Sequence, residues 1–306
     1  RDGTTNVDNC IIENNSAIHE GGGFYINTTS TPSEFKNTVV SNNDAGTEGG
    51  AIFLIANGAL FENVTSSNNI AMIGGSSYVK GNDTTVRNCT LDNNSATTNG
   101  GGFYIEGDNC HVEDVILTNN TAEEGGAIFV IGDSARFENI TSANNTADYY
   151  GGSLYVHGDN INVKNSNFTD NEADFGGGAI YVSGHEGKFT NNIIDSNEGN
   201  FGGGIYVSGD GYEFSDNQVT DNKGVFGGGI AIDGSNTLFT NNNISSNHAG
   251  SMGGAVYADG ENSNFINNNF SHNSADYTGG ALYVDGADTY LDDIIGHNNT
   301  ALSGIS

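Results

Sequence analysis

Glycine-led apolar segments recur along the chain at a nearly fixed interval. One copy is Gly125-Gly126-Ala127-Ile128-Phe129-Val130, and in most copies aliphatic or phenylalanine side chains flank a central residue. Because side chains alternate along a strand, the flanking residues are predicted to point inward and the central residue outward. The eleven copies begin at Gly21, Gly49, Gly74, Gly100, Gly125, Gly151, Gly177, Gly202, Gly227, Gly253 and Gly279, in steps of 25 or 26 residues apart from the first step of 28. Such a period indicates a solenoid of stacked repeats.

A second landmark in each repeat is an apolar residue followed two positions later by Asn or Asp, and repeat positions are counted from this apolar residue. Its twelve copies are Val7, Phe35, Phe61, Val86, Val112, Phe137, Val163, Phe189, Phe214, Phe239, Phe265 and Leu291. Short runs of Val, Ile, Phe, Tyr and Thr are separated by Gly, Asn and Asp, and no long run has a helical period. The pattern therefore predicts an all-β chain with about three short strands per repeat.

One repeat alone cannot be stable. Four or five inward apolar side chains contribute roughly 1.5–3 kcal/mol each, whereas ordering each residue costs about 1–2 kcal/mol. Stacking of equivalent strands about 4.8 Å apart supplies the missing stabilisation, and crossovers are right-handed by strong preference. We therefore expect a single-stranded right-handed parallel β-helix of about 12 coils. It would run continuously through residues 1–306 as a segment of a longer chain, with a small loop insertion near 27–34 that contains the single proline, Pro32.

Position +8 is asparagine in every repeat. A side-chain amide both donates and accepts hydrogen bonds, so stacked copies can form a ladder through the coils; the alternative is that these residues only form turns. The predicted structural ladder comprises Asn15, Asn43, Asn69, Asn94, Asn120, Asn145, Asn171, Asn197, Asn222, Asn247, Asn273 and Asn299.

Asn-X-Ser/Thr sequences are the acceptor motif for N-glycosylation, and they occur at several repeat positions. We expect the +2 asparagines Asn63, Asn88 and Asn139 to point inward and to be unavailable. The candidate glycosylation sites with outward side chains are Asn14, Asn93, Asn119, Asn144 and Asn298 at +7, and Asn167, Asn243 and Asn269 at +4.

The central residue of the glycine-led strand is aromatic in ten of the eleven copies, which predicts an outward stripe along one face. Such rings could bind a glycan or a neighbouring chain; the alternatives are that they only pack on one another or that they point inward. The stripe comprises Tyr25, Phe53, Tyr78, Tyr104, Phe129, Tyr155, Tyr181, Tyr206, Tyr257 and Tyr283.

Composition excludes several classes of function. Eight Lys and Arg residues against 38 Asp and Glu residues give a net charge of −30, which disfavours nucleic acids and anionic membranes. Three cysteines imply no disulfide framework, and no apolar run is long enough for a membrane span. The chain has no long loops and no paired catalytic groups, so we expect no enzyme, no catalytic residue, no cofactor and no metal site. Calcium bound at the surface could still reduce the repulsion between carboxylates of the acidic turns.

Gly-Gly-Ala-Ile/Leu/Val at 49–52, 125–128, 177–180, 253–256 and 279–282, together with Phe-x-x-Asn at 168–171 and 270–273, resembles the repeat of chlamydial polymorphic outer-membrane proteins. The low proline and high asparagine content is more similar still to adhesin-like surface proteins of methanogenic archaea. The resemblance implies an extracellular, cell-surface adhesin or rigid stalk that contacts a glycan, a cell-surface protein or identical chains. The alternatives are a filament subunit that stacks end to end and, third, a polysaccharide-active β-helix enzyme.

Overall fold

The computed structural model describes residues 4–28 and 32–302, which form two compact units. The first unit comprises residues up to 148 together with 152–157, and the second comprises 149–151 and the residues from 158 onward. Within each unit, strands pair in parallel with the equivalent strands of adjacent coils and belong to the sheets A, B, C and D. The predicted parallel β-helix is confirmed, with four strands per coil instead of three. The insertion expected near 27–34 falls partly on residues 29–31, outside the described residues.

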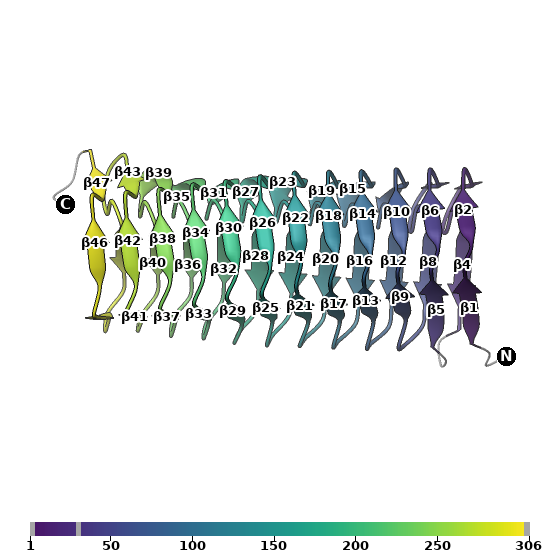
Figure 1. The fold of residues 1–306 in the computed structure, drawn as a ribbon, viewed down its shortest axis with the longest axis horizontal. Helices are drawn as coiled ribbons and strands as arrows, with labels where there is room; N and C mark the ends of the chain where they lie inside the picture. The colour runs from purple at the N-terminus through teal and green to yellow at the C-terminus, as the bar shows by residue number, and fades with distance from the viewer. Residues whose placement is uncertain (1–3, 29–31, 303–306) are drawn as a thin grey trace. The chain divides into compact units, whose positions relative to one another are not determined.

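In the first unit, four parallel sheets follow one another around each coil (Figure 1). Sheet A contains β1 (Thr5–Asp8), β5 (Ser33–Lys36), β9 (Leu60–Glu62), β13 (Thr85–Arg87), β17 (His111–Glu113) and β21 (Arg136–Glu138). Sheet B contains β2 (Ile11–Glu13), β6 (Val39–Ser41), β10 (Thr65–Ser67), β14 (Thr90–Asp92), β18 (Ile116–Thr118) and β22 (Thr141–Ala143). Sheet C contains β3 (Ser16–Ala17), β7 (Asp44–Ala45), β11 (Ile70–Ile73), β15 (Ser95–Asn99), β19 (Thr121–Glu124) and the start of β23 (Thr146–Tyr150). Sheet D contains β4 (Phe24–Asn27), β8 (Ile52–Ile55), β12 (Ser77–Lys80), β16 (Phe103–Glu106), β20 (Ile128–Ile131) and β24 (Leu154–His157).

The second unit repeats the same order of sheets. Sheet A contains β25 (Asn162–Lys164), β29 (Lys188–Thr190), β33 (Glu213–Ser215), β37 (Leu238–Thr240), β41 (Asn264–Ile266) and β45 (Tyr290–Asp292). Sheet B contains β26 (Asn167–Thr169), β30 (Ile193–Asp195), β34 (Gln218–Thr220), β38 (Asn243–Ser245), β42 (Asn269–Ser271) and β46 (Ile295–His297). Sheet C contains β27 (Glu172–Gly176), β31 (Glu198–Phe201), β35 (Lys223–Phe226), β39 (His248–Met252), β43 (Ser274–Ala275) and β47 (Thr300–Ala301). Sheet D contains β28 (Ile180–Ser183), β32 (Ile205–Ser208), β36 (Ile230–Asp233), β40 (Val256–Asp259) and β44 (Leu282–Asp285).

Sheets A, B and D supply the large side chains of the interior, and sheet C supplies small ones such as Ala173. Phe214 on sheet A, Val219 on sheet B, and Ile205 and Val207 on sheet D are all buried. Phenylalanines of successive coils stack, as Phe189 and Phe214 do with ring centroids 4.9 Å apart. The core is therefore a set of side-chain columns that each coil shares with its neighbours.

The +8 asparagines from Asn43 to Asn273 are buried where sheet B turns into sheet C, whereas Asn15 is exposed and Asn299 is half-buried. In the first unit, Asn43 donates its backbone N–H and its side-chain amide to the Oδ1 atom of Asn69, at 2.9 and 3.0 Å. The same amide donates to the carbonyl of Ile12 in the preceding coil at 2.9 Å. Asn69 repeats this arrangement with Asn94 and Val40. Amides that would be costly to bury unpaired thus have partners in both adjacent coils.

A second buried asparagine column occurs only in the second unit, at position +3, and sequence reasoning missed it. Asn192 donates its backbone N–H and side-chain amide to Oδ1 of Asn217, both at 3.0 Å, and Asn217 does the same to Asn242. Asn242 continues to Asn268 at 2.9 Å. In these coils, hydrogen-bond ladders run along both ends of sheet B.

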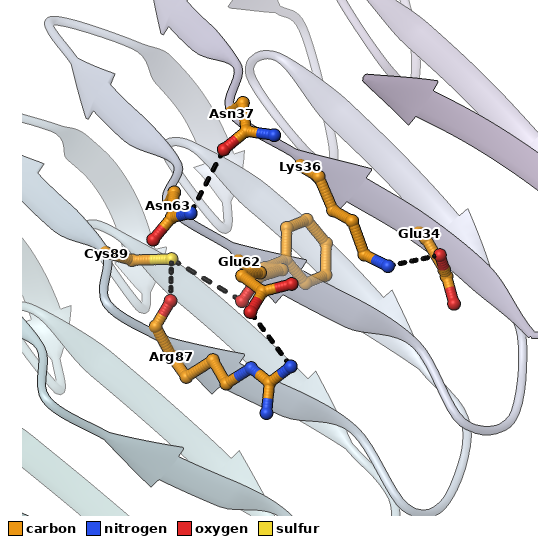
Figure 2. A network of polar contacts seen from close by, with 8 residues as sticks. Glu34, Lys36, Asn37, Glu62, Asn63, Arg87 and Cys89 are labelled. Atoms are coloured by element: carbon orange, nitrogen blue, oxygen red, sulfur yellow. Dashed lines mark hydrogen bonds and ion pairs between the residues drawn. The ribbon is translucent and has the colours of Figure 1, made fainter. Parts of the chain in front are cut away.

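The prediction that the +2 asparagines point inward is wrong. Asn63 is exposed and has a φ of 53°, in the left-handed region that Asn tolerates better than most residues. Figure 2 shows its amide donating to Oδ1 of Asn37, 3.0 Å away, on the outer surface of the coil. The left-handed residue reverses the direction of its side chain, so strand alternation no longer applies at +2.

Candidate functional site

A glycine corner joins sheet C to sheet D and determines which side chains meet there. Gly202 has a φ of +64°, and a Cβ atom at this position would collide with the carbonyl oxygen of Ile205. The turn brings Phe201, the last residue of β31, beside Tyr206 of β32, with ring centroids 5.5 Å apart. The residue before each glycine pair therefore borders the predicted aromatic stripe.

In the first unit, the predicted stripe is largely covered. Phe53, Tyr78 and Phe129 are only 7%, 8% and 5% exposed, so these three rings offer little of the free surface that the sequence predicts for the stripe. Consecutive rings from Tyr25 to Tyr155 stack with centroids 4.4–5.2 Å apart and planes within 15° of parallel. Because each ring face lies against the next ring, the sugar-stacking faces are occupied. Tyr104 and Tyr155 are half-buried, and Tyr25 alone is exposed in this unit.

In the second unit, the stripe residues Tyr181, Tyr206, Tyr257 and Tyr283 are half-buried and belong to a wider group of aromatic side chains. Tyr150 packs against Tyr181 and Phe175, at 4.6 and 5.4 Å between centroids, and Phe201 packs against Phe226 at 5.0 Å. We call the following seven residues the corner aromatic cluster: Tyr150, Phe175, Tyr181, Phe201, Tyr206, Phe226 and Tyr257.

Sequence reasoning missed the sheet C members of this cluster. Their signal is an aromatic residue directly before a glycine, as in Tyr150-Gly151, Phe175-Gly176, Phe201-Gly202 and Phe226-Gly227. Before the glycine pairs of the first unit stand Glu20, Glu48, Ile73, Asn99 and Glu124 instead. Phe175 is 47% exposed and so presents free ring surface to solvent.

A surface groove of about 450 Å³ lies on sheet C of the second unit, beside the corner aromatic cluster. Its polar lining consists of Glu172, Asp174, Glu198, Asn200, Lys223 and His248. The floor includes small residues such as Ala173, Gly199 and Gly224, which leave room between the outward side chains. Asp174, which lines the groove, directly precedes Phe175 on β27, and both residues are exposed.

Charges in the groove are unevenly paired. Lys223 forms an ion pair with Glu198, and Nδ1 of His248 lies 3.0 Å from the hydroxyl of Ser274. Glu172 and Asp174 are exposed and have no ion pair within the part of the chain that the structure describes. One end of the groove therefore carries two uncompensated carboxylates.

Burial perturbs titratable groups along the corner. Desolvation raises the pKa of Tyr206 well above its usual value, and the charge of Asp233 adds to the effect. In the first unit, desolvation likewise raises the pKa of Glu48 and of Glu124, although the Asn99 amide donates to Glu124 at 2.9 Å and opposes that shift. At the same corner, three coils of the first unit thus carry a carboxylate, at Glu20, Glu48 and Glu124, whereas Phe201 and Phe226 stand there in the second unit.

The candidate glycosylation sites differ in exposure. Asn14, Asn93, Asn119, Asn144 and Asn298 are exposed with φ between 52° and 58°, and Asn243 is exposed on sheet B. Asn167 and Asn269 are half-buried, and their Oδ1 atoms are buried without a partner among the described residues. Asn63, Asn88 and Asn139 are exposed, so the expectation that they are unavailable is wrong. Glycosylation at any of these positions stays a prediction.

The model of the right handed beta helix region matches residues 113–270 and 178–304, which together span more than half of the chain. The chain belongs to the right-handed β-helix family. The repeat of the Chlamydia polymorphic membrane protein matches residues 88–106, and this match suggests a surface-exposed protein. No curated protein matches the chain.

Three solved structures resemble this right-handed β-helix. The A-module of mannuronan C-5 epimerase AlgE6 from Azotobacter vinelandii has 14% identity and a TM-score of 0.49, over 96% of this chain and 90% of that chain. The A-module of AlgE4 from the same organism has 10% identity and a TM-score of 0.34, over 90% and 89%. Endopolygalacturonase I from Stereum purpureum, complexed with two galacturonate, has 12% identity and a TM-score of 0.33, over 98% and 97%. These likenesses concern the fold alone.

The acidic turns of this β-helix are linked through the backbone. Oδ1 of Asp108 accepts the backbone N–H of Asp133 at 3.0 Å, and Oδ1 of Asp210 accepts that of Ser235 at 2.7 Å. Among the described residues, no group of three or more His, Cys, Asp or Glu side chains is placed to hold a metal ion. No helix there is long and apolar enough to cross a bilayer.

Proposed function

We propose that this β-helix is a non-enzymatic, extracellular adhesin-type scaffold that binds glycan at the groove on sheet C of the second unit. The observation that carries the proposal is the exposed ring of Phe175 beside a groove lined by carboxylate, amide, amine and imidazole groups. Sugars are recognised by this combination, since ring faces pack against apolar sugar faces while polar groups bind hydroxyls. The match to a surface-type repeat supports the same role.

The position of the contact differs from the stripe expected from the sequence. Stripe rings of the first unit stack on one another and leave little free ring surface. Phe175 instead stands at a coil with a register irregularity between Ala173 and Gly176, which places an additional outward side chain beside the groove. We therefore assign glycan contact to Phe175 and the groove. The partly buried rings of the corner aromatic cluster pack against Phe175 and hold it in place.

The proposal is tested by glycan-array and affinity-electrophoresis measurements on the purified chain, comparing Phe175→Ala with Tyr25→Ala. Tyr25 is also exposed but lies in the first unit. Loss of one sugar–ring contact should weaken binding about tenfold, corresponding to about 1.4 kcal/mol, with unchanged circular dichroism. Equal binding by the two variants contradicts the assignment. Release of sugar fragments that stops in Glu172→Gln would identify an enzyme instead.

A further inference from the structure

The groove follows the stacking direction of the coils. Glu172 pairs in register with Glu198, Glu198 with Lys223, and Lys223 with His248, so each of four coils contributes at least one outward polar side chain to its lining. Neighbouring parallel strands lie about 4.8 Å apart, which is close to the length of one hexose in an extended chain. A linear glycan lying along this direction would meet a polar side chain of a new coil at each successive sugar.

An extended peptide fits this surface less well. Peptides that bind sheets gain affinity by adding a strand to an open edge. Here the strands beneath the groove lie inside sheet C, and their backbone groups are already used between coils: the N–H of Lys223 donates to the carbonyl of Asn197 at 2.9 Å, for example. A glycan needs no backbone partner and can use the side chains alone.

The charge of the groove selects among glycans. Glu172, Asp174 and Glu198 contribute −3 and Lys223 contributes +1, so the lining carries −2 with neutral histidine. The chain as a whole carries −30. Polymers of uronic acids are therefore repelled, whereas a positively charged glycan is attracted. A protonated amine near Phe175 would also interact favourably with the aromatic ring.

We propose that the groove on sheet C binds a linear glycan of amino sugars with free amino groups, one sugar per coil across four coils. The inference rests on the proposed glycan-binding function and names its ligand class. Glu172 and Asp174 would bind the amino groups, and Phe175 would pack against a sugar ring at the same end of the groove.

Calorimetric titration with glucosamine oligomers, N-acetylglucosamine oligomers and oligogalacturonates tests the inference. We expect glucosamine oligomers to bind tightest, with affinity rising up to four sugars because the groove lining comes from four coils. Added salt should weaken this binding. Glu172→Gln and Asp174→Asn should each weaken it about tenfold. The matched control Glu213→Gln removes the same charge at an exposed site on sheet A and should leave binding unchanged.

The outcomes separate the two proposals. If N-acetylated oligomers or oligogalacturonates bind more tightly than glucosamine oligomers and Phe175→Ala still weakens binding, the groove is a glycan site and the amino-sugar assignment is wrong. Equal effects of Glu172→Gln and Glu213→Gln also overturn the assignment. Binding of oligolysine as tight as that of glucosamine oligomers would indicate a basic peptide ligand. If neither these oligomers nor any glycan on the array binds, the proposed function fails as well.

Discussion

Asn197 donates its backbone N–H and its side-chain amide to a single acceptor, Oδ1 of Asn222 in the next coil, and both hydrogen bonds are 2.9 Å long. The same amide also reaches the carbonyl of Phe168 in the preceding coil at 3.0 Å. Asn197 is 1% exposed, so none of these groups can turn to water instead. One side chain therefore connects three consecutive coils.

Replacing this amide with a carboxylate should destabilise the second unit strongly. Asn197→Asp removes the donor and places a buried negative charge against carbonyl oxygens, with an expected loss of about 3 kcal/mol in the free energy of unfolding. Chemical denaturation measures the loss. Asn191→Asp serves as control because Asn191 is exposed in the same coil and its side-chain amide donates to Oδ1 of Asn165. Similar losses in both variants would contradict a stabilising ladder.

A methyl group at the corner between sheets C and D should also be destabilising. Gly202→Ala forces a left-handed residue with a Cβ atom against the carbonyl of Ile205, and we expect a cost of about 3 kcal/mol. At Gly250, the nearest atom to an added Cβ is 3.8 Å away, so Gly250→Ala should change stability by less than about 0.5 kcal/mol. Comparable melting temperatures for the two variants would refute the steric argument.

Buried tyrosines should make the protein sensitive to alkali. Desolvation raises the pKa of Tyr212, which is fully buried and donates its hydroxyl to the carbonyl of Gly184 at 2.9 Å. A raised folded-state pKa means that the unfolded chain loses its proton first, so stability is intact below about pH 10 and falls as pH rises further. Unfolding midpoints at about pH 8 and about pH 11, with tyrosinate absorbance, measure this effect. Tyr212→Phe should lessen the decrease in the unfolding midpoint between these two pH values. An unchanged decrease would exclude Tyr212 as its source.

The thiols should differ in reactivity. Burial raises the pKa of Cys89 to about 11 and that of Cys110 to about 12, and Sγ of Cys89 also donates to the carbonyl of Arg87 at 3.1 Å (Figure 2). Because the thiolate is the reactive form, a thiol reagent at about pH 8 should modify only the half-buried Cys10 in the native protein. In denaturant, the reagent should also modify Cys89 and Cys110, because unfolding exposes their thiols. Modification of all three thiols under native conditions would show that the coils open locally.

The fold was predictable because inward and outward side chains alternate along the strands of each coil, and the period of the repeat shows which residues stack on one another. That reasoning correctly placed Ile128 and Val130 in the core. It failed at Asn63, because a left-handed residue reverses side-chain direction without leaving a signal in the hydrophobic pattern. The buried column that includes Asn192 was missed for the same reason: it stands one residue after the left-handed Asn191.

The candidate site was less predictable than the fold. Alternation identified Tyr206 and Tyr257 as surface-facing, and they are half-buried. It could not show that rings in adjacent coils cover one another, as Phe53 and Tyr78 do. Phe175 was missed because its coil has an additional residue before the corner, shown by the register shift between Ala173 and Gly176. Local irregularities of this kind depend on packing between coils and not on the repeat itself.

The residue before each glycine pair varies while the coil around it does not. Glu48 and Glu124 occupy this place in the first unit, and Phe201 and Phe226 occupy it in the second. The glycines that follow make the same backbone bonds in both: Gly49 donates to the carbonyl of Ile73 at 2.9 Å, and Gly202 to that of Phe226 at 2.9 Å. Duplication or recombination of a single coil could therefore move the variable surface residue together with the backbone hydrogen bonds that hold it. The surface could then change in sequence while the buried residues stay the same.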